Sequence, residues 1–259
     1  MVKLEYYNGS YRTAPRRVTL FSRALPSLIL YSKVVAVVFS ASSRAKRSGY
    51  GNEGWAGSSL DTLRALEDVG VEVEITGTDN FTSLDGPCVF ISNHMSTLET
   101  FVLPVIIQPY KDVTFVVKQS LVDYPVFRYV MRSRDPVTVG RTNPRDDLKA
   151  VLEGGTERLK AGRSMIIFPQ TTRMPVFDPG SFNTIGIKLA KKADVPVVPI
   201  ALKTDAWGNG RRFKDFGRID PSKKVYFAFG GPMKVRDRGT EEHQTTLEFI
   251  KGKLGEWGG

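Results

Sequence analysis

The stretch CVFISNHMSTLETFVLPVII, residues 88–107, carries the pattern that decides the fold. It opens with a short apolar run, passes through a polar segment around His94 and ends in a helical pattern. A buried strand, a loop and a helix in this order form the repeating unit of α/β proteins. In such proteins, reactive side chains gather where a strand ends and a helix begins. His94 stands at such a place.

The same alternation continues on both sides of this stretch. Short β-like runs occupy residues 71–76, 113–117, 137–139, 165–168, 197–202 and 225–229, and helical patterns occupy residues 124–132, 145–160, 182–192 and 241–254. Strands separated by helices favour a largely parallel sheet that helices cover on both faces. We therefore predict an α/β fold with a mostly parallel central sheet flanked by helices.

Composition and motifs exclude several classes of protein. The chain has 259 residues, enough to bury a full hydrophobic core. Cys88 is its only cysteine, so an internal disulfide is excluded. The sequence contains no cysteine–histidine cluster, no phosphate-binding glycine loop and no serine-nucleophile elbow. We therefore expect no metal site and no bound cofactor.

Positive charge is concentrated at the N-terminus. Residues 1–50 contain nine lysines and arginines against one acid, Glu5, in a chain whose net charge is +10. Such a basic end indicates an anionic partner, either nucleic acid or an anionic membrane surface. The basic clusters at 211–218 and 234–238 match no recognisable nucleic-acid-binding motif, so we expect no nucleic acid partner.

An apolar segment, residues 24–41, lies within this basic end. Lys33 stands in its middle, and the segment is shorter than the roughly 20 apolar residues of a membrane span. With arginines on either side, it is typical of a helix that lies in the membrane interface. We expect peripheral or monotopic attachment to the cytoplasmic face of a membrane. A core helix with a solvated basic edge is the alternative.

Glycine and serine content predicts a boundary after this segment. Residues 47–59 are rich in both, which is typical of a connector. A short helix would follow, with Ser59 as its N-cap and Gly70 just past its end. We accordingly predict a membrane-binding helical segment with its connector at 1–58, and an α/β domain at 59–259.

His94 and Glu99 form a candidate catalytic pair. A neutral imidazole is a natural general base near pH 7, and a carboxylate behind it fixes the tautomer and stabilises the imidazolium. Their separation along the chain permits this contact if His94 precedes the helix and Glu99 lies in its first turn. The alternative is a capping box, in which Glu99 only accepts a hydrogen bond from the backbone of Ser96.

Three cations, Lys118, Arg141 and Arg173, each follow a predicted strand. Cations at strand ends can converge on one phosphate group, and arginine binds phosphate in a bidentate manner. For each of them taken alone, the alternative is a surface charge.

Four blocks of the sequence resemble the glycerolipid acyltransferases, the family that contains bacterial 1-acylglycerol-3-phosphate acyltransferase. NHMSTLE, residues 93–99, resembles the family's N-H-x-x-x-x-D motif, and residues 116–141 resemble its second block. IIFPQTTR, residues 166–173, resembles F-P-E-G-T-R, and VPVVPIAL, residues 195–202, resembles the proline-bearing fourth block. The blocks occur in the family's order, so their combination is specific.

The resemblance implies direct transfer of an acyl group to the hydroxyl of a lysophospholipid. His94 would take the proton, Glu99 would orient the imidazole, and acyl-CoA or acyl carrier protein would supply the acyl group. The substrate-binding residues would be Lys118, Arg141, Gln170, Thr171, Thr172 and Arg173, with the cations on the phosphate. The expected acceptor is 1-acylglycerol-3-phosphate, and the product is phosphatidic acid.

The sequence departs from the family motifs at four positions. Glu99 replaces the usual aspartate, Gln170 the usual glutamate and Thr171 the usual glycine, while Arg128 occupies a place often held by glycine. The changes at 170 and 171 leave two alternatives open. One is the same chemistry on another lyso-acceptor, such as a lyso-ornithine lipid. The other is a non-catalytic lipid-binding protein on the same scaffold.

Overall fold

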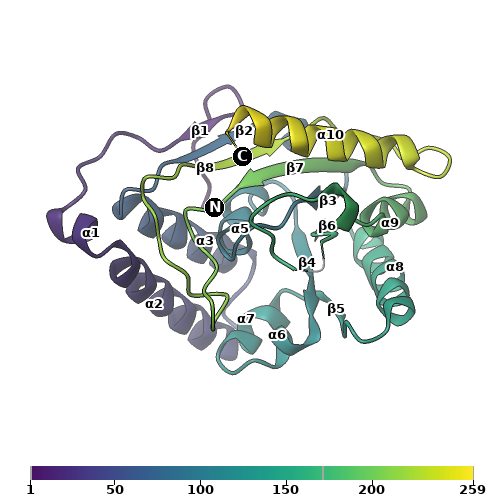
Figure 1. Cartoon of the computed structure of the whole chain (residues 1–259). Helices are drawn as coiled ribbons and strands as arrows, with labels where there is room; N and C mark the ends of the chain where they lie inside the picture. Colours follow the sequence, from purple (N-terminus) through teal and green to yellow (C-terminus); the bar gives the residue numbers. More distant parts are fainter. Residues whose placement is uncertain (1, 171, 259) are drawn as a thin grey trace.

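The computed structural model describes residues 2–170 and 172–258. An eight-stranded sheet runs through this part of the chain in the order β1-β2-β8-β7-β3-β6-β4-β5 (Figure 1). Its strands are β1 (Tyr11–Arg12), β2 (Val73–Thr76), β3 (Val89–Ser92), β4 (Val113–Lys118), β5 (Val137–Val139), β6 (Ser164–Ile167), β7 (Val197–Lys203) and β8 (Val225–Phe229). Only the β1–β2 and β7–β8 pairs of this sheet are antiparallel. The predicted α/β fold with a mostly parallel sheet is confirmed.

Helices connect these strands. They are α1 (Leu20–Ala24), α2 (Pro26–Lys46), α3 (Asn52–Asp68), α4 (Asp79–Thr82), α5 (Leu98–Ile107), α6 (Gln119–Asp123), α7 (Phe127–Ser133), α8 (Pro144–Lys160), α9 (Ile185–Ala193) and α10 (Thr240–Glu256), with a 3-10 turn at Pro179–Ser181. The strands and helices predicted from residue 71 onward lie within about three residues of the observed ones. The sequence patterns missed β1 and the short helices α1, α4 and α6.

The predicted connector at 47–59 is wrong over most of its length, because α3 begins at Asn52. Ser59 is therefore a buried residue of the helix interior and not an N-cap. Glycine lowers the intrinsic propensity for a helix, but the burial of Trp55 and its neighbours outweighs this preference. The division into segments 1–58 and 59–259 stays a prediction.

Helix α5 depends on that buried serine. Pro104 lies inside α5 and has no N–H, so it disturbs the hydrogen bonds of the helix. The Ser59 hydroxyl bridges the gap: it donates to the Phe101 carbonyl at 2.6 Å and accepts from the Val105 N–H at 2.8 Å. The α3–α5 contact thus preserves the helix that carries Glu99.

Helices cover both faces of the sheet. α3 packs on α5 on one side, whereas α8 and α9 pack together on the other and α10 runs along β7 (Figure 1). Right-handed crossovers explain this, since the chain moves outward from β3 to β4 and then returns through β6 to β7. The adjacent strands β3 and β6 consequently lead to opposite faces, which makes their carboxyl ends the expected place for a ligand.

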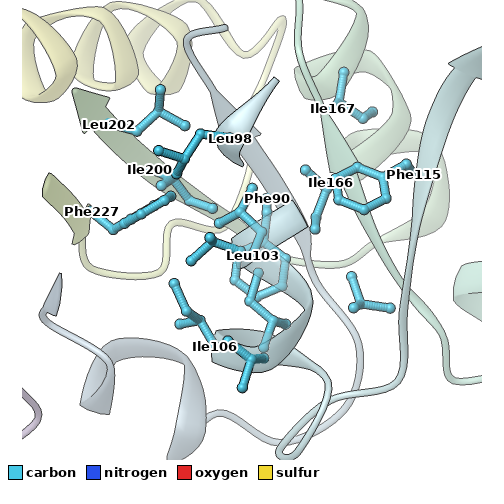
Figure 2. Packing of buried hydrophobic residues seen from close by; sticks show 14 of the residues in the cluster. Phe90, Leu98, Leu103, Ile106, Phe115, Ile166, Ile167, Ile200, Leu202 and Phe227 are labelled. Atoms are coloured by element: carbon cyan, nitrogen blue, oxygen red, sulfur yellow. The ribbon is translucent and has the colours of Figure 1, made fainter. Parts of the chain in front are cut away.

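A single apolar cluster fills the space between these layers. Figure 2 shows Phe90 of β3 in the same cluster as Leu103 and Ile106 of α5, with side chains from β6, β7 and β8 around them. Burial of each large apolar side chain stabilises the fold by about 1.5–3 kcal/mol. Because α5 is apolar almost all round, it is held firmly, and Glu99 is held with it.

The N-terminal helix α2 is longer than predicted. It continues to Lys46, and its 21 residues are long and apolar enough to cross a membrane by length and composition, so the expectation that the segment is too short is wrong. Only 22% of its apolar window is buried. α2 packs against α3 and α7, and Lys33 in its middle forms an ion pair of 2.6 Å with Asp68 of α3.

Candidate active site

The loop after β3 holds His94 at the carboxyl edge of the sheet. The loop after β6 fixes it in place: the His94 N–H donates to Gln170 Oε1 at 2.7 Å, and the His94 carbonyl accepts from the Met174 N–H at 2.8 Å. The imidazole stacks on Phe168, with ring centroids 4.3 Å apart. Its side chain is 16% exposed, so a substrate can reach the ring.

Glu99 lies behind this imidazole and is fully buried. His94 Nδ1 is 2.9 Å from Glu99 Oε1, which also accepts from the backbone N–H groups of Met95 (2.7 Å) and Ser96 (2.8 Å). The other oxygen, Oε2, accepts from the hydroxyls of Thr204 (2.7 Å) and Ser96 (2.9 Å). The sequence raised two alternatives for Glu99, a contact with His94 and a capping box with Ser96. The same carboxylate makes both: it accepts hydrogen bonds at the N-terminus of the helix and contacts the imidazole.

The charge of Glu99 determines which nitrogen of His94 carries the proton. Burial alone would raise the pKa of Glu99, but hydrogen bonds from His94 and Thr204, with the charge of the imidazolium, hold that pKa below its ordinary value. An ionised carboxylate only accepts hydrogen bonds, so Nδ1 is the protonated nitrogen. In the neutral imidazole, Nε2 then has a free lone pair and is able to take a proton.

Two polar residues of the site were given no role from the sequence. Asn93 joins β3 to β7: its Nδ2 donates to the Leu202 carbonyl at 2.8 Å, and its Oδ1 accepts from the Leu202 N–H at 3.0 Å. Thr204 follows β7 and bonds to Glu99 across 105 residues of chain. The position of Asn93 directly before His94 was a usable signal, whereas nothing in the sequence marks Thr204.

The turn after β6 brings Arg173 beside the first turn of α5. The Arg173 guanidinium donates to the Thr97 hydroxyl and, at 2.7 Å, to Asp215 Oδ1. Thr172 lies in the same turn, where its hydroxyl is 3.5 Å from Lys214 Nζ. Thr171, the remaining predicted residue of this turn, lies outside the described residues. Gln170 and Arg173 thus flank His94 and the start of α5.

Lys118 and Arg141 lie farther along the same edge of the sheet. Lys118 ends β4 and Arg141 follows β5, the next two strands beyond β6. The Arg141 N–H donates to the Asp147 carboxylate at 3.0 Å, which holds its loop to the start of α8. In residues 2–170 and 172–258, no hydrogen bond joins Lys118 to His94, Glu99 or Arg173.

Hydrogen bonds define this site. A hollow of about 270 Å³ lies elsewhere, between α6, α7 and β5, and includes none of the residues above. Within the described ranges, no three histidine, cysteine or acidic side chains are grouped as metal ligands would be. The geometry provides a base backed by a carboxylate, with a guanidinium close by.

A base of this kind at the ends of parallel strands is suited to the transfer of a chemical group onto a hydroxyl. Comparison with known proteins indicates that this group is an acyl group. The family model described as acyltransferase matches residues 72–203, about half of the chain. The chain belongs to the acyltransferase family. The resemblance seen in the four sequence blocks is thereby confirmed.

Its relatives share one name. The chain is 37% identical over 132 residues to the 1-acyl-sn-glycerol-3-phosphate acyltransferase of Pseudomonas aeruginosa, a match that covers 51% of this chain and 49% of that protein. It is 35% identical over 131 residues to the chloroplastic 1-acyl-sn-glycerol-3-phosphate acyltransferase BAT2 of Brassica napus, covering 51% and 37%. The matched part spans about half or less of these relatives.

A solved structure shares the fold over nearly the whole chain. The 1-acyl-sn-glycerophosphate acyltransferase PlsC of Thermotoga maritima superposes with a TM-score of 0.67 at 19% identity, covering 91% of this chain and 96% of that one. This likeness extends the shared architecture well beyond residues 72–203.

Proposed function

We propose that the protein transfers an acyl group from an acyl thioester to the free hydroxyl of a lysophospholipid. The acceptor is 1-acylglycerol-3-phosphate, and the product is phosphatidic acid. The observation that carries this proposal is the 2.9 Å contact between His94 Nδ1 and Glu99 Oε1, close to the Arg173 guanidinium. The shared name of the relatives supports the choice of acceptor.

The reaction follows from the tautomer of His94. Nε2 removes the proton of the acceptor hydroxyl. At the same time, the oxygen of that hydroxyl attacks the thioester carbonyl of acyl-CoA or of acyl carrier protein. The tetrahedral intermediate then collapses, the carbon–sulfur bond breaks, and the departing thiolate takes the proton from the imidazolium. Glu99 stabilises that imidazolium. General base catalysis of this kind contributes about 10²- to 10⁴-fold to the rate.

The phosphate of the acceptor would bind at the edge of the sheet beside Arg173. This guanidinium already holds a carboxylate, that of Asp215, in the geometry of a charge-assisted hydrogen bond. Gln170 and Thr172 belong to the same turn, and we assign Thr171 to this site with them. Arg141 and Lys118 complete the positive edge and contribute to its attraction for an anionic headgroup.

We infer that α2 lies in the interface of the membrane at its cytoplasmic face. One side of the helix, including Leu30 and Val34, is buried against the protein. The other side exposes an apolar stripe that consists of Leu25, Leu28, Val35 and Phe39. A helix with one protein-covered side and one apolar exposed side fits an interfacial position better than a span surrounded by lipid.

Release of free thiol from acyl-CoA in the presence of 1-acylglycerol-3-phosphate tests the proposed function. His94→Ala should lower turnover by about 10²- to 10⁴-fold while the protein stays folded. The matched control is His243→Ala, because His243, the only other histidine, lies on α10. Near-normal turnover in His94→Ala contradicts the mechanism.

A panel of lyso-acceptors tests the choice of substrate in the same assay. We expect the highest kcat/KM for the acceptor with a phosphomonoester, because Arg173 lies beside the base. A strong preference for an acceptor without that group, such as a lyso-ornithine lipid, contradicts the proposed acceptor and leaves the chemistry intact. Absence of any acceptor-dependent thiol release favours a lipid-binding protein on this scaffold.

A further inference from the structure

Residues 208–218, the loop between β7 and β8, form a basic and aromatic surface that the proposed chemistry does not use. Its exposed cations are Arg211, Arg212, Lys214 and Arg218. Two aromatic side chains also face solvent: Phe213 is 73% exposed and Phe216 is 58% exposed. Exposed apolar side chains that gather in one patch with a polar rim mark sites of contact with a protein or a membrane.

This loop continues the apolar stripe of α2. The Tyr31 hydroxyl of α2 donates to the Gly217 carbonyl at 2.6 Å, and the Tyr31 and Phe216 rings lie 5.3 Å apart. Leu28 and Val35 are three residues before and four residues after Tyr31, so they lie on the same side of the helix. Phe216 of the loop therefore continues the exposed stripe of α2 by way of Tyr31.

The same loop also contacts the catalytic edge. Its Asp215 carboxylate accepts hydrogen bonds from Arg173 Nη1 at 2.7 Å and from the Thr97 hydroxyl at 3.1 Å. The Asp215 carbonyl accepts from Trp207 Nε1 at 3.0 Å, which fixes the backbone at this point. An acidic side chain of the loop thus occupies the guanidinium to which we assign the acceptor's phosphate.

We propose that residues 208–218 bind an anionic lipid surface together with α2, and that this contact withdraws Asp215 from Arg173. Cations attract lipid headgroups, each raising the affinity for an anionic surface about fivefold, and exposed aromatic rings enter the interface. Continuity with the α2 stripe favours a lipid surface over a nucleic acid. The release of Arg173 rests on the proposed function, whereas the lipid contact does not.

Vesicle cosedimentation of the full chain tests the lipid contact. With vesicles of phosphatidylcholine and phosphatidylglycerol, R211Q/R212Q should weaken binding about 25-fold, and F213S should weaken it about tenfold. R236Q/R238Q is the matched control, since it removes two exposed arginines before α10, and should change binding less than twofold. Equal losses for both arginine pairs, or unchanged binding of F213S, overturn the proposal.

Calorimetric binding of a short-chain, water-soluble 1-acylglycerol-3-phosphate tests the release of Arg173 without need of turnover. In the absence of vesicles, D215N should lower the Kd about two- to fivefold, the range expected for an exposed ion pair that competes with the ligand. D237N, at another exposed aspartate, should leave the Kd unchanged. An unchanged or higher Kd for D215N overturns this part. Failure of the catalytic proposal appears separately, as absent thiol release with normal binding.

Discussion

The carboxylate of Glu99 accepts hydrogen bonds from two backbone N–H groups, two hydroxyls and one imidazole. An aspartate is usual at this position of the family motif, and the extra methylene of glutamate would be expected to disturb the contact with His94. The observed 2.9 Å distance shows that this backbone accommodates the longer side chain. Capping of α5 and orientation of the His94 imidazole thus depend on one group, and in the proposed mechanism its neighbours are positioning residues.

Thr204→Val removes a hydroxyl from this carboxylate at almost constant volume. We expect kcat to fall about tenfold, with the KM for the acceptor unchanged, because a hydrogen bond to a charged group contributes about 1.5–3 kcal/mol. Thr204→Ser retains the hydroxyl and should recover most of the activity. Steady-state kinetics corrected for folded protein decide the matter: a purely structural role predicts normal kcat per folded molecule in Thr204→Val.

Glu99→Gln should reduce both activity and stability, and the loss of stability should depend on pH. Because the folded-state pKa of Glu99 is lowered, its ionised form stabilises the native state fully above about pH 4.5, and this contribution disappears as the pH falls toward the lowered value. The difference in free energy of unfolding between wild type and Glu99→Gln should therefore shrink below pH 4.5. Urea denaturation between pH 7 and pH 3.5 measures it; a constant difference would falsify the assignment.

At the scale of elements, close approach between helices matters more than helix propensity. α3 is helical despite its glycines because one of its faces is buried. Ser59 of α3 then hydrogen-bonds to the backbone groups of α5 on either side of Pro104. Helices α8 and α9 approach each other in a similar way: a Cβ atom added at Gly155 would lie 2.6 Å from Leu189 Cδ2. Gly154, the preceding residue, has its nearest such neighbours at 3.4 Å.

These two glycines provide a matched pair. Gly155→Ala should lower the free energy of unfolding by about 1–3 kcal/mol, because Leu189 is fully buried and has little room to move. Gly154→Ala should raise it by about 0.5–1 kcal/mol, since alanine is the better helix former and the space is adequate. Thermal or urea unfolding of the two variants checks the prediction. Shifts of the same sign would contradict the tight α8–α9 contact.

For the whole molecule, the sheet brings two loops together that lie far apart in the sequence. β3 and β6 are neighbours, so the turn with Gln170 and Arg173 lies against His94. The 208–218 loop reaches the same edge through Asp215, and it contacts helix α2 through the bond from Tyr31 to Gly217. A lipid acceptor would therefore meet the base and the guanidinium near the surface from which it comes.

The Cys88 thiol should be unreactive in the folded molecule. It is fully buried at the start of the core, and burial raises the pKa of its thiol to about 12. We expect no reaction with Ellman's reagent in native buffer and one thiol per chain after unfolding in guanidinium chloride. Thiol titration of both states measures this. An unreactive Cys88 would also add no background to the thiol-release assay of the proposed function. Rapid labelling of the native protein would show that the core opens near β3.

The local sequence pattern was sufficient to predict those features that depend on neighbouring residues. Alternating apolar runs and helical periods determined the mostly parallel sheet, and the short spacing from His94 to Glu99 placed them across one strand–helix turn. Thr204, the contact of Asp215 with Arg173 and the helical state of residues 52–58 were decided only by tertiary structure. The first two are contacts between groups far apart in the chain. The third depends on burial that outweighs the low helix propensity of glycine. Neither long-range contact nor burial of this kind produces a periodic pattern in the sequence.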